Sequence, residues 1–183
     1  MKPSFEGSGR KSIRVPGFDY TQNGAYFITV CSHNNEHLFG QIVDCKMDQN
    51  SFGRLVEEEW KLTGSKRDNV ELDYYCIMPN HFHGIILILN EQSEYLASRE
   101  RKSAAYQSIR SGSLSSIVRA FKSATTKRIN ELRNSRGDRV WQRNYWERIL
   151  RNENELMRCR KYIVNNPLKW ELDEYYTGNA NGG

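Results

Sequence analysis

The chain turns at Pro79-Asn80, continues through His81-Phe82-His83, and then enters the apolar segment Ile-Ile-Leu-Ile-Leu at residues 85–89. On a β-strand, side chains two residues apart point to the same face, roughly 6–7 Å from each other. A strand over residues 81–89 would therefore let both imidazoles reach one metal ion, and neutral imidazole is a good ligand for divalent metals. The competing interpretation is a chance pair of surface histidines at the end of a strand.

The segments around this strand predict the fold class. Residues 72–78 form a second predicted strand, and the short turn at 79–80 makes the two strands an antiparallel hairpin. Two more strands are predicted at 25–31 and around 146–150, and three helices at 51–63, 113–133 and 153–166. The order β-α-β-β-α-β-α indicates an α+β fold, a ferredoxin-like split βαβ antiparallel sheet with one added C-terminal helix.

The strand that carries the histidines is apolar on both faces beyond His83. Ile85 and Leu87 share the histidine face, and Ile86 and Ile88 lie on the other. A strand buried on both faces needs cover on both sides of its sheet. We therefore expect two helices on one face and the last helix on the other, close to the histidines.

The last predicted helix carries Tyr162 and Asn166, which are neighbours at positions i and i+4. They flank an apolar stripe formed by Leu156, Cys159 and Ile163. An amide oxygen of Asn166 could complete a metal site with the two histidines, while the Tyr162 hydroxyl points at a phosphodiester. The competing interpretation is a half-buried packing tyrosine and an asparagine that merely ends the helix.

The charge is distributed unevenly along the 183 residues, a length that favours one domain. Residues 99–161 hold 17 Lys and Arg against 6 Asp and Glu, a balance of +11, whereas the whole chain has a net charge of +5. A basic block of this kind suits a polyanionic partner such as nucleic acid. Candidate DNA-binding residues are Arg119, Lys122, Lys127 and Arg143 in this block, and Arg10, Lys11 and Arg14 in the N-terminal region.

Other features bound the cellular setting and the domain limits. No run of 18 apolar residues is present, so no membrane span is expected, and four cysteines without a CxxC pair fit a reducing cytoplasm. We expect a cytoplasmic, nucleoid-associated protein. The expected organisation is a basic arm over 1–18, one domain over 19–177 with a mobile linker at 91–112, and a disordered tail at 178–183.

Together these segments resemble the single-tyrosine, His-hydrophobe-His transposases, most closely the REP-associated tyrosine transposases. The resemblance covers roughly residues 10–172. It is carried by Arg-Lys-Ser-Ile-Arg (10–14), Met-Pro-Asn-His-Phe-His-Gly (78–84), Phe-Lys-Ser (121–123), Trp-Gln-Arg-Asn-Tyr-Trp-Glu (141–147) and Tyr-Ile-Val-Asn-Asn-Pro (162–167).

This resemblance implies that His81, His83 and Asn166 bind a divalent ion, Mg²⁺ or Mn²⁺, and that Tyr162 is the nucleophile. It implies an endonuclease and strand transferase that cleaves single-stranded, hairpin-forming DNA, such as palindromic repeat elements, through a 5′-phosphotyrosine. The alternative is a domesticated DNA-binding module that does not use this chemistry. Both a monomer and a homodimer are open, because the tyrosine helix could dock on its own sheet or on a partner's.

Overall fold

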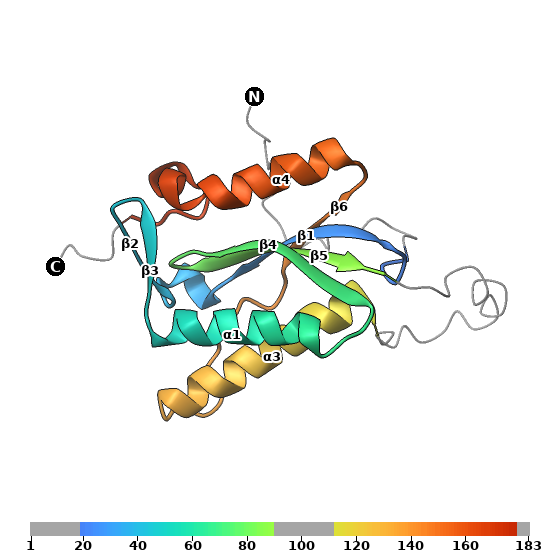
Figure 1. Ribbon diagram of the computed structural model, residues 1–183. Coiled ribbons are helices and arrows are strands. Elements are labelled where there is room, and N and C mark those ends of the chain that lie inside the picture. The colour runs from blue at the N-terminus through green and yellow to red at the C-terminus, as the bar shows by residue number, and fades with distance from the viewer. Residues whose placement is uncertain (1–18, 90–111, 179–183) are drawn as a thin grey trace.

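The computed structural model describes residues 19–89 and 112–178. An antiparallel sheet lies between two helical layers, with α1 (Ser51–Ser65) and α3 (Leu114–Leu132) on one face and α4 (Glu153–Asn165) on the other (Figure 1). The predicted α+β class is confirmed, and α4 docks on the sheet of its own chain.

Some sequence-based expectations lie outside these residues. They are the N-terminal arm 1–18, with Arg10, Lys11 and Arg14, residues 91–111 of the expected linker, and residues 179–183 of the expected tail. Within the two described ranges, no helix combines the length and the apolar character that a membrane span requires.

Four strands form the main sheet in the order β4-β5-β1-β6. Their bounds are Gly24–Cys31 for β1, Val70–Ile77 for β4, His81–Ile88 for β5 and Trp146–Leu150 for β6. Helix α1 connects β1 to β4, and α3 lies between β5 and β6 along the chain. This is the strand order and connectivity of the ferredoxin-like unit, with α4 as the added helix.

The sequence analysis missed a small second sheet between β1 and α1. Strands β2 (Gly40–Val43) and β3 (Lys46–Gln49) pair through a turn at Asp44 and Cys45, whose φ angles are 48° and 60°. Hairpin turns of this kind usually carry Asn-Gly or Asp-Gly, and Asp-Cys gives no such signal. Each strand has only four residues and none of them is fully buried, so no apolar run marks the hairpin in the sequence.

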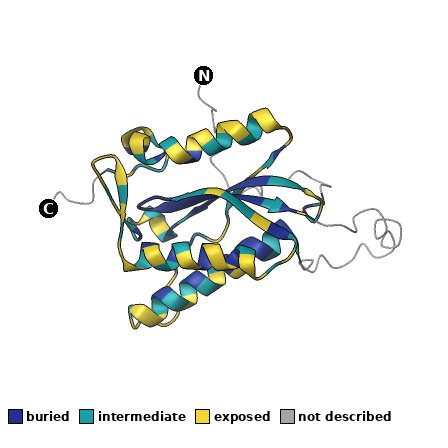
Figure 2. Ribbon diagram, viewed as in Figure 1, coloured by how far each residue is buried: buried dark blue, intermediate teal, exposed yellow. Residues whose placement is uncertain are grey.

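The core under α1 and α3 centres on Trp60, which is fully buried. Its ring lies 4.6 Å from the ring of Phe82 and 5.3 Å from that of Phe121, measured between centroids. A side chain at Gly84 would place its Cβ 2.6 Å from Trp60 Cζ2, so only glycine fits this position of β5. Figure 2 shows the buried residues concentrated in the sheet and on the inner helix faces.

The opposite face of the sheet is covered by α4, as the apolar pattern of β5 predicts. Ile163 packs against Phe27, Ile85 and Leu150. The helix begins at Asn152, whose Oδ1 accepts a hydrogen bond from the Glu155 backbone N–H at 3.0 Å. This cap satisfies one of the backbone N–H groups that the first turn of a helix leaves without a partner.

Candidate active site

The two histidines lie side by side on β5, on the face that α4 covers, and both are buried. Their ring centroids are 4.5 Å apart. Each ring is held at its Nδ1 atom: His81 Nδ1 lies 2.9 Å from Asn80 Oδ1, and His83 Nδ1 lies 2.8 Å from Thr29 Oγ1 on the neighbouring strand. The Nε2 atoms are therefore the ones left to bind a ligand.

Burial keeps both imidazoles neutral. It lowers the pKa of His81 from 6.5 to about 3, and it lowers the pKa of His83 well below its ordinary value, with the proximity of His81 adding to the effect. Neutral imidazole is the form that binds metals, so the pair is ready to coordinate at neutral pH.

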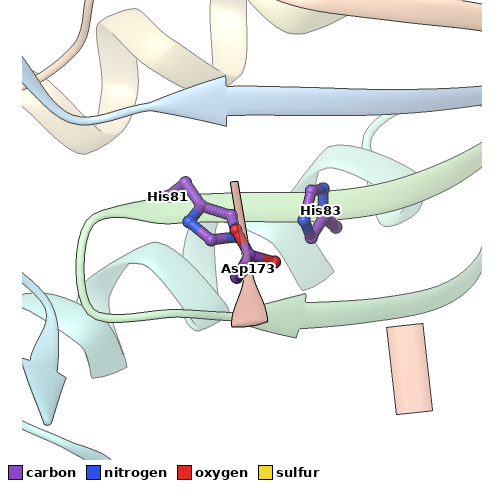
Figure 3. Close-up of side chains that lie close together, drawn as sticks. All are labelled: His81, His83 and Asp173. Atoms are coloured by element: carbon purple, nitrogen blue, oxygen red, sulfur yellow. The ribbon is translucent and has the colours of Figure 1, made fainter. Parts of the chain in front are cut away.

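A third group, the carboxylate of Asp173, joins the histidine pair. One donor atom from each of the three side chains lies within 4.8 Å of the others. Figure 3 shows the imidazoles on one strand and the Asp173 side chain beside them, on the chain that follows the short 3₁₀ helix η2 (Pro167–Leu172). The sequence analysis missed Asp173, because nothing in the sequence distinguishes it from the nearby Glu171 and Glu174.

The structure brings Tyr162 to the same place. Its hydroxyl oxygen lies 3.4 Å from His83 Nε2 and 3.4 Å from Asp173 Oδ2, while the residue keeps 39% of its surface exposed. Partial burial of the hydroxyl, followed by the negative charge of Asp173, raises the pKa of Tyr162. Tyr162 is therefore protonated at neutral pH and still reachable from solvent.

Asn166, the residue expected to be a metal ligand, is also at the site. Its Nδ2 donates to Asp173 Oδ2 at 2.9 Å. Its Oδ1 is buried and has no hydrogen-bond partner among the described residues, and the same holds for His81 Nε2. Buried polar atoms are normally paired, so two such lone pairs in one site need an explanation. Imidazole nitrogen together with carboxylate and amide oxygen is a donor set that fits a divalent metal.

Four of the candidate DNA-binding residues lie in the described part of the chain, and they divide between α3 and the loop before β6. Arg119 and Lys127 are exposed on α3, on the other side of the sheet from α4 (Figure 1). Lys122 Nζ donates to the backbone carbonyls of Gln142 and Arg143 at 2.7 and 3.0 Å, and burial lowers its pKa to about 8. Lys122 thus holds the loop on which the exposed Arg143 lies.

Comparison with known proteins agrees with the fold. No family model matches the chain. A solved REP-associated tyrosine transposase, bound to a REP hairpin, superposes with a TM-score of 0.58 over 88% of this chain and 77% of its own, at 16% sequence identity. The fold is therefore that of the REP-associated tyrosine transposases, as the sequence resemblance predicted.

A closer relative gives the family. An uncharacterized protein of Haemophilus influenzae is 39% identical over 169 residues, which cover 91% of this chain and 93% of the relative. The chain belongs to the same family as this protein.

Proposed function

We propose that the protein is a transposase, a metal-dependent endonuclease and strand transferase that cleaves single-stranded, hairpin-forming DNA. We propose that it acts in the cytoplasm, in association with the nucleoid. The supporting observation is the convergence of the Tyr162 hydroxyl on His83 Nε2, at 3.4 Å, across 79 residues of sequence. The solved transposase of the same fold is bound to a REP hairpin, which supports hairpin DNA as the substrate.

The metal ligands would be His81 Nε2, His83 Nε2 and an Asp173 oxygen, with Asn166 Oδ1 beside them. A Mg²⁺ or Mn²⁺ ion held by these residues would supply Lewis-acid chemistry, which would polarise the phosphodiester and offset the negative charge of the transition state. The low histidine pKa values keep both nitrogen lone pairs available. The two oxygen donors suit such hard cations.

Tyr162 would attack the phosphorus atom of the DNA backbone. Its oxygen forms a bond to phosphorus, the bond from phosphorus to the 3′ oxygen breaks, the 3′ oxygen gains a proton, and the tyrosine proton passes to water. The resulting 5′-phosphotyrosine conserves the energy of the phosphodiester. The free 3′-hydroxyl can therefore attack it and rejoin the strands without ATP.

The test is a covalent adduct between the protein and a 3′-labelled single-stranded oligonucleotide that folds into an imperfect hairpin; any palindromic repeats found in the DNA that flanks the gene supply the hairpins to test first. With Mn²⁺, the protein should retain the label on a denaturing gel, and Tyr162→Phe should abolish the adduct because it removes the nucleophile. Tyr74→Phe is the matched control, because Tyr74 is an exposed tyrosine on β4 that retains its ring in the variant.

Two results would contradict the proposal. A normal adduct yield in Tyr162→Phe would exclude Tyr162 as the nucleophile. Tight hairpin binding without any adduct, with Mg²⁺ or Mn²⁺, would instead indicate the alternative, a DNA-binding module that does not use this chemistry. His81→Ala should lose the adduct and keep hairpin binding, since the proposed DNA-binding residues are others.

A further inference from the structure

Asn80, at the turn between β4 and β5, is fully buried beside the candidate metal site. Its Nδ2 donates to two backbone carbonyls, that of Asn35 at 3.3 Å and that of Tyr175 at 2.7 Å. Its Oδ1 lies 2.9 Å from His81 Nδ1. Both polar atoms of this side chain are therefore engaged: the nitrogen with two distant segments of the chain, and the oxygen with the neighbouring histidine.

These contacts determine which nitrogen of His81 carries the proton. Carbonyl oxygens only accept hydrogen bonds, so the amide NH₂ of Asn80 must face Asn35 and Tyr175, and its oxygen must face His81. An amide oxygen also only accepts, so His81 Nδ1 must donate. A neutral imidazole has one N–H, and the lone pair of His81 therefore lies on Nε2, toward Asp173 and His83.

The other histidine is not constrained in this way. His83 Nδ1 contacts the hydroxyl of Thr29, which can either donate or accept. The contact orients the His83 ring without fixing its proton. Of the two histidines, only His81 therefore has the position of its ring proton fixed by an amide.

The same amide also holds the segment that carries Asp173. Tyr175 donates its backbone N–H to Asp173 Oδ1 at 2.8 Å, and its carbonyl accepts from Asn80 Nδ2, 95 residues away in sequence. The Tyr175 ring lies 4.7 Å from the His81 ring. Asn80 therefore connects the turn that precedes the histidines to the backbone that presents the carboxylate.

We propose that Asn80 is the positioning residue of the metal site: it keeps His81 Nε2 unprotonated, and it holds Asp173 opposite the histidine pair. The proposal rests on the proposed function only in that the site binds a divalent metal. It requires neither DNA cleavage nor a particular DNA sequence.

The first measurement needs no metal and no DNA. Long-range ¹H–¹⁵N correlation spectra of ¹⁵N-histidine-labelled, metal-free protein report which ring nitrogen carries the proton. We expect His81 to be protonated at Nδ1 in the native protein and to become a mixture of both forms in Asn80→Ala. A His81 ring protonated at Nε2 in the native protein would overturn the proposal, whether or not the variant folds.

The second measurement is the affinity for Co²⁺, a probe with a visible absorption spectrum. Loss of a group that orients a ligand typically weakens metal binding by about 10–100-fold, and we expect this loss and an altered spectrum in Asn80→Ala. Asn80→Asp retains an acceptor for His81 Nδ1 and should recover part of the affinity. Asn130→Ala is the control, because it also removes an amide that donates to a backbone carbonyl, that of Asp138, but lies away from the site.

The outcomes separate this proposal from the proposed function. Native affinity and spectrum in a folded Asn80→Ala protein would overturn the positioning role, even if DNA cleavage is observed. The expected tautomer and Co²⁺ affinities would support the role, even if no adduct with DNA ever forms.

Discussion

The burial of two neutral histidines determines how the stability of this protein depends on pH. Their burial removes the charged form, because an imidazolium without water around it is unfavourable. The metal-free folded protein therefore resists protonation at His81, whose pKa falls from 6.5 to about 3. The unfolded chain has no such restriction.

This difference predicts an acid-dependent loss of stability. Below about pH 6.5 the unfolded state binds a proton at His81 that the folded state does not bind, so the stabilisation is complete above that pH and decreases as the pH falls toward 3. The slope is about 1.4 kcal/mol for each pH unit and each such histidine. Urea unfolding between pH 7 and 4.5, with a chelator present, measures it.

In His81→Gln, the slope of the unfolding free energy against pH should be smaller than in the native protein by the contribution of about one proton. His33→Gln serves as the control, because His33 lies outside the site. Equal slopes for His81→Gln and the native protein would show that burial of His81 does not govern acid sensitivity.

The site was predictable only where its residues stand in local patterns. His81 and His83 share a strand face, and Tyr162 and Asn166 share a helix face, so spacing alone brought them into consideration. Asp173 has no such pattern, since its position depends on the fold of η2 after Pro167. The role of Asn80 depends on hydrogen bonds across 45 and 95 residues, which no local spacing encodes.

Among the helices and strands, α4 is the one whose position matters most for the proposed chemistry, because it carries Tyr162. Arg160 donates to Asp73 Oδ2 on β4 at 2.7 Å, and its guanidinium lies over the Tyr74 ring, 5.6 Å from the centroid. Asp73 is largely shielded from solvent. This ion pair connects the middle of α4 to the edge strand of the sheet, two residues before Tyr162.

We expect Arg160→Met to increase the local mobility of α4 strongly and to lower the unfolding free energy of the whole protein only slightly. The loss of one partly buried, charge-assisted hydrogen bond costs about 1–2 kcal/mol of unfolding free energy. Adduct formation should fall by about 10–100-fold, because small displacements of a reacting group are costly in rate. Amide hydrogen exchange should speed up in α4 and stay unchanged in α1.

Arg54→Met is the matched control, since Arg54 is an exposed arginine on α1 whose guanidinium donates to the Gln49 carbonyl, on the other face of the sheet from α4. If α4 exchanges at the native rate in Arg160→Met, the ion pair does not position the helix.

The elements themselves were largely predictable. The long helices and the strands of the main sheet begin and end within two residues of the predicted limits, because each has a periodic apolar face. The β2–β3 hairpin and η2 were not predicted. They are short and half-exposed, and their geometry depends on turn conformations and on the chain packed beneath them.

In the molecule as a whole, two of the candidate DNA-binding cations lie on a different layer from the candidate active site. The exposed cations Arg119 and Lys127 lie on α3, across the sheet from Tyr162. Contact with DNA through such residues displaces counterions from phosphates. Affinity for a single strand should therefore fall steeply with salt, with a log–log slope of about −0.7 for each neutralised phosphate.

Arg119→Gln should flatten this slope by about 0.7 and weaken hairpin and scrambled oligonucleotides alike. Lys122→Met should change the slope less, because its ammonium is already bound to two carbonyls. Titrations at several salt concentrations between about 50 and 200 mM measure both effects. A salt-independent affinity would exclude a phosphate-contacting surface of this kind.

Because Asp173 lies late in the sequence, the candidate site can form only late during synthesis of the chain. The histidine strand leaves the ribosome well before Tyr162, which follows His83 by 79 residues, and Asp173 comes later still. Segments nearer the N-terminus are synthesised first and leave the ribosome first. A nascent chain thus presents the histidine strand before it presents Tyr162, and the proposed DNA-cutting centre is absent until translation has passed residue 173.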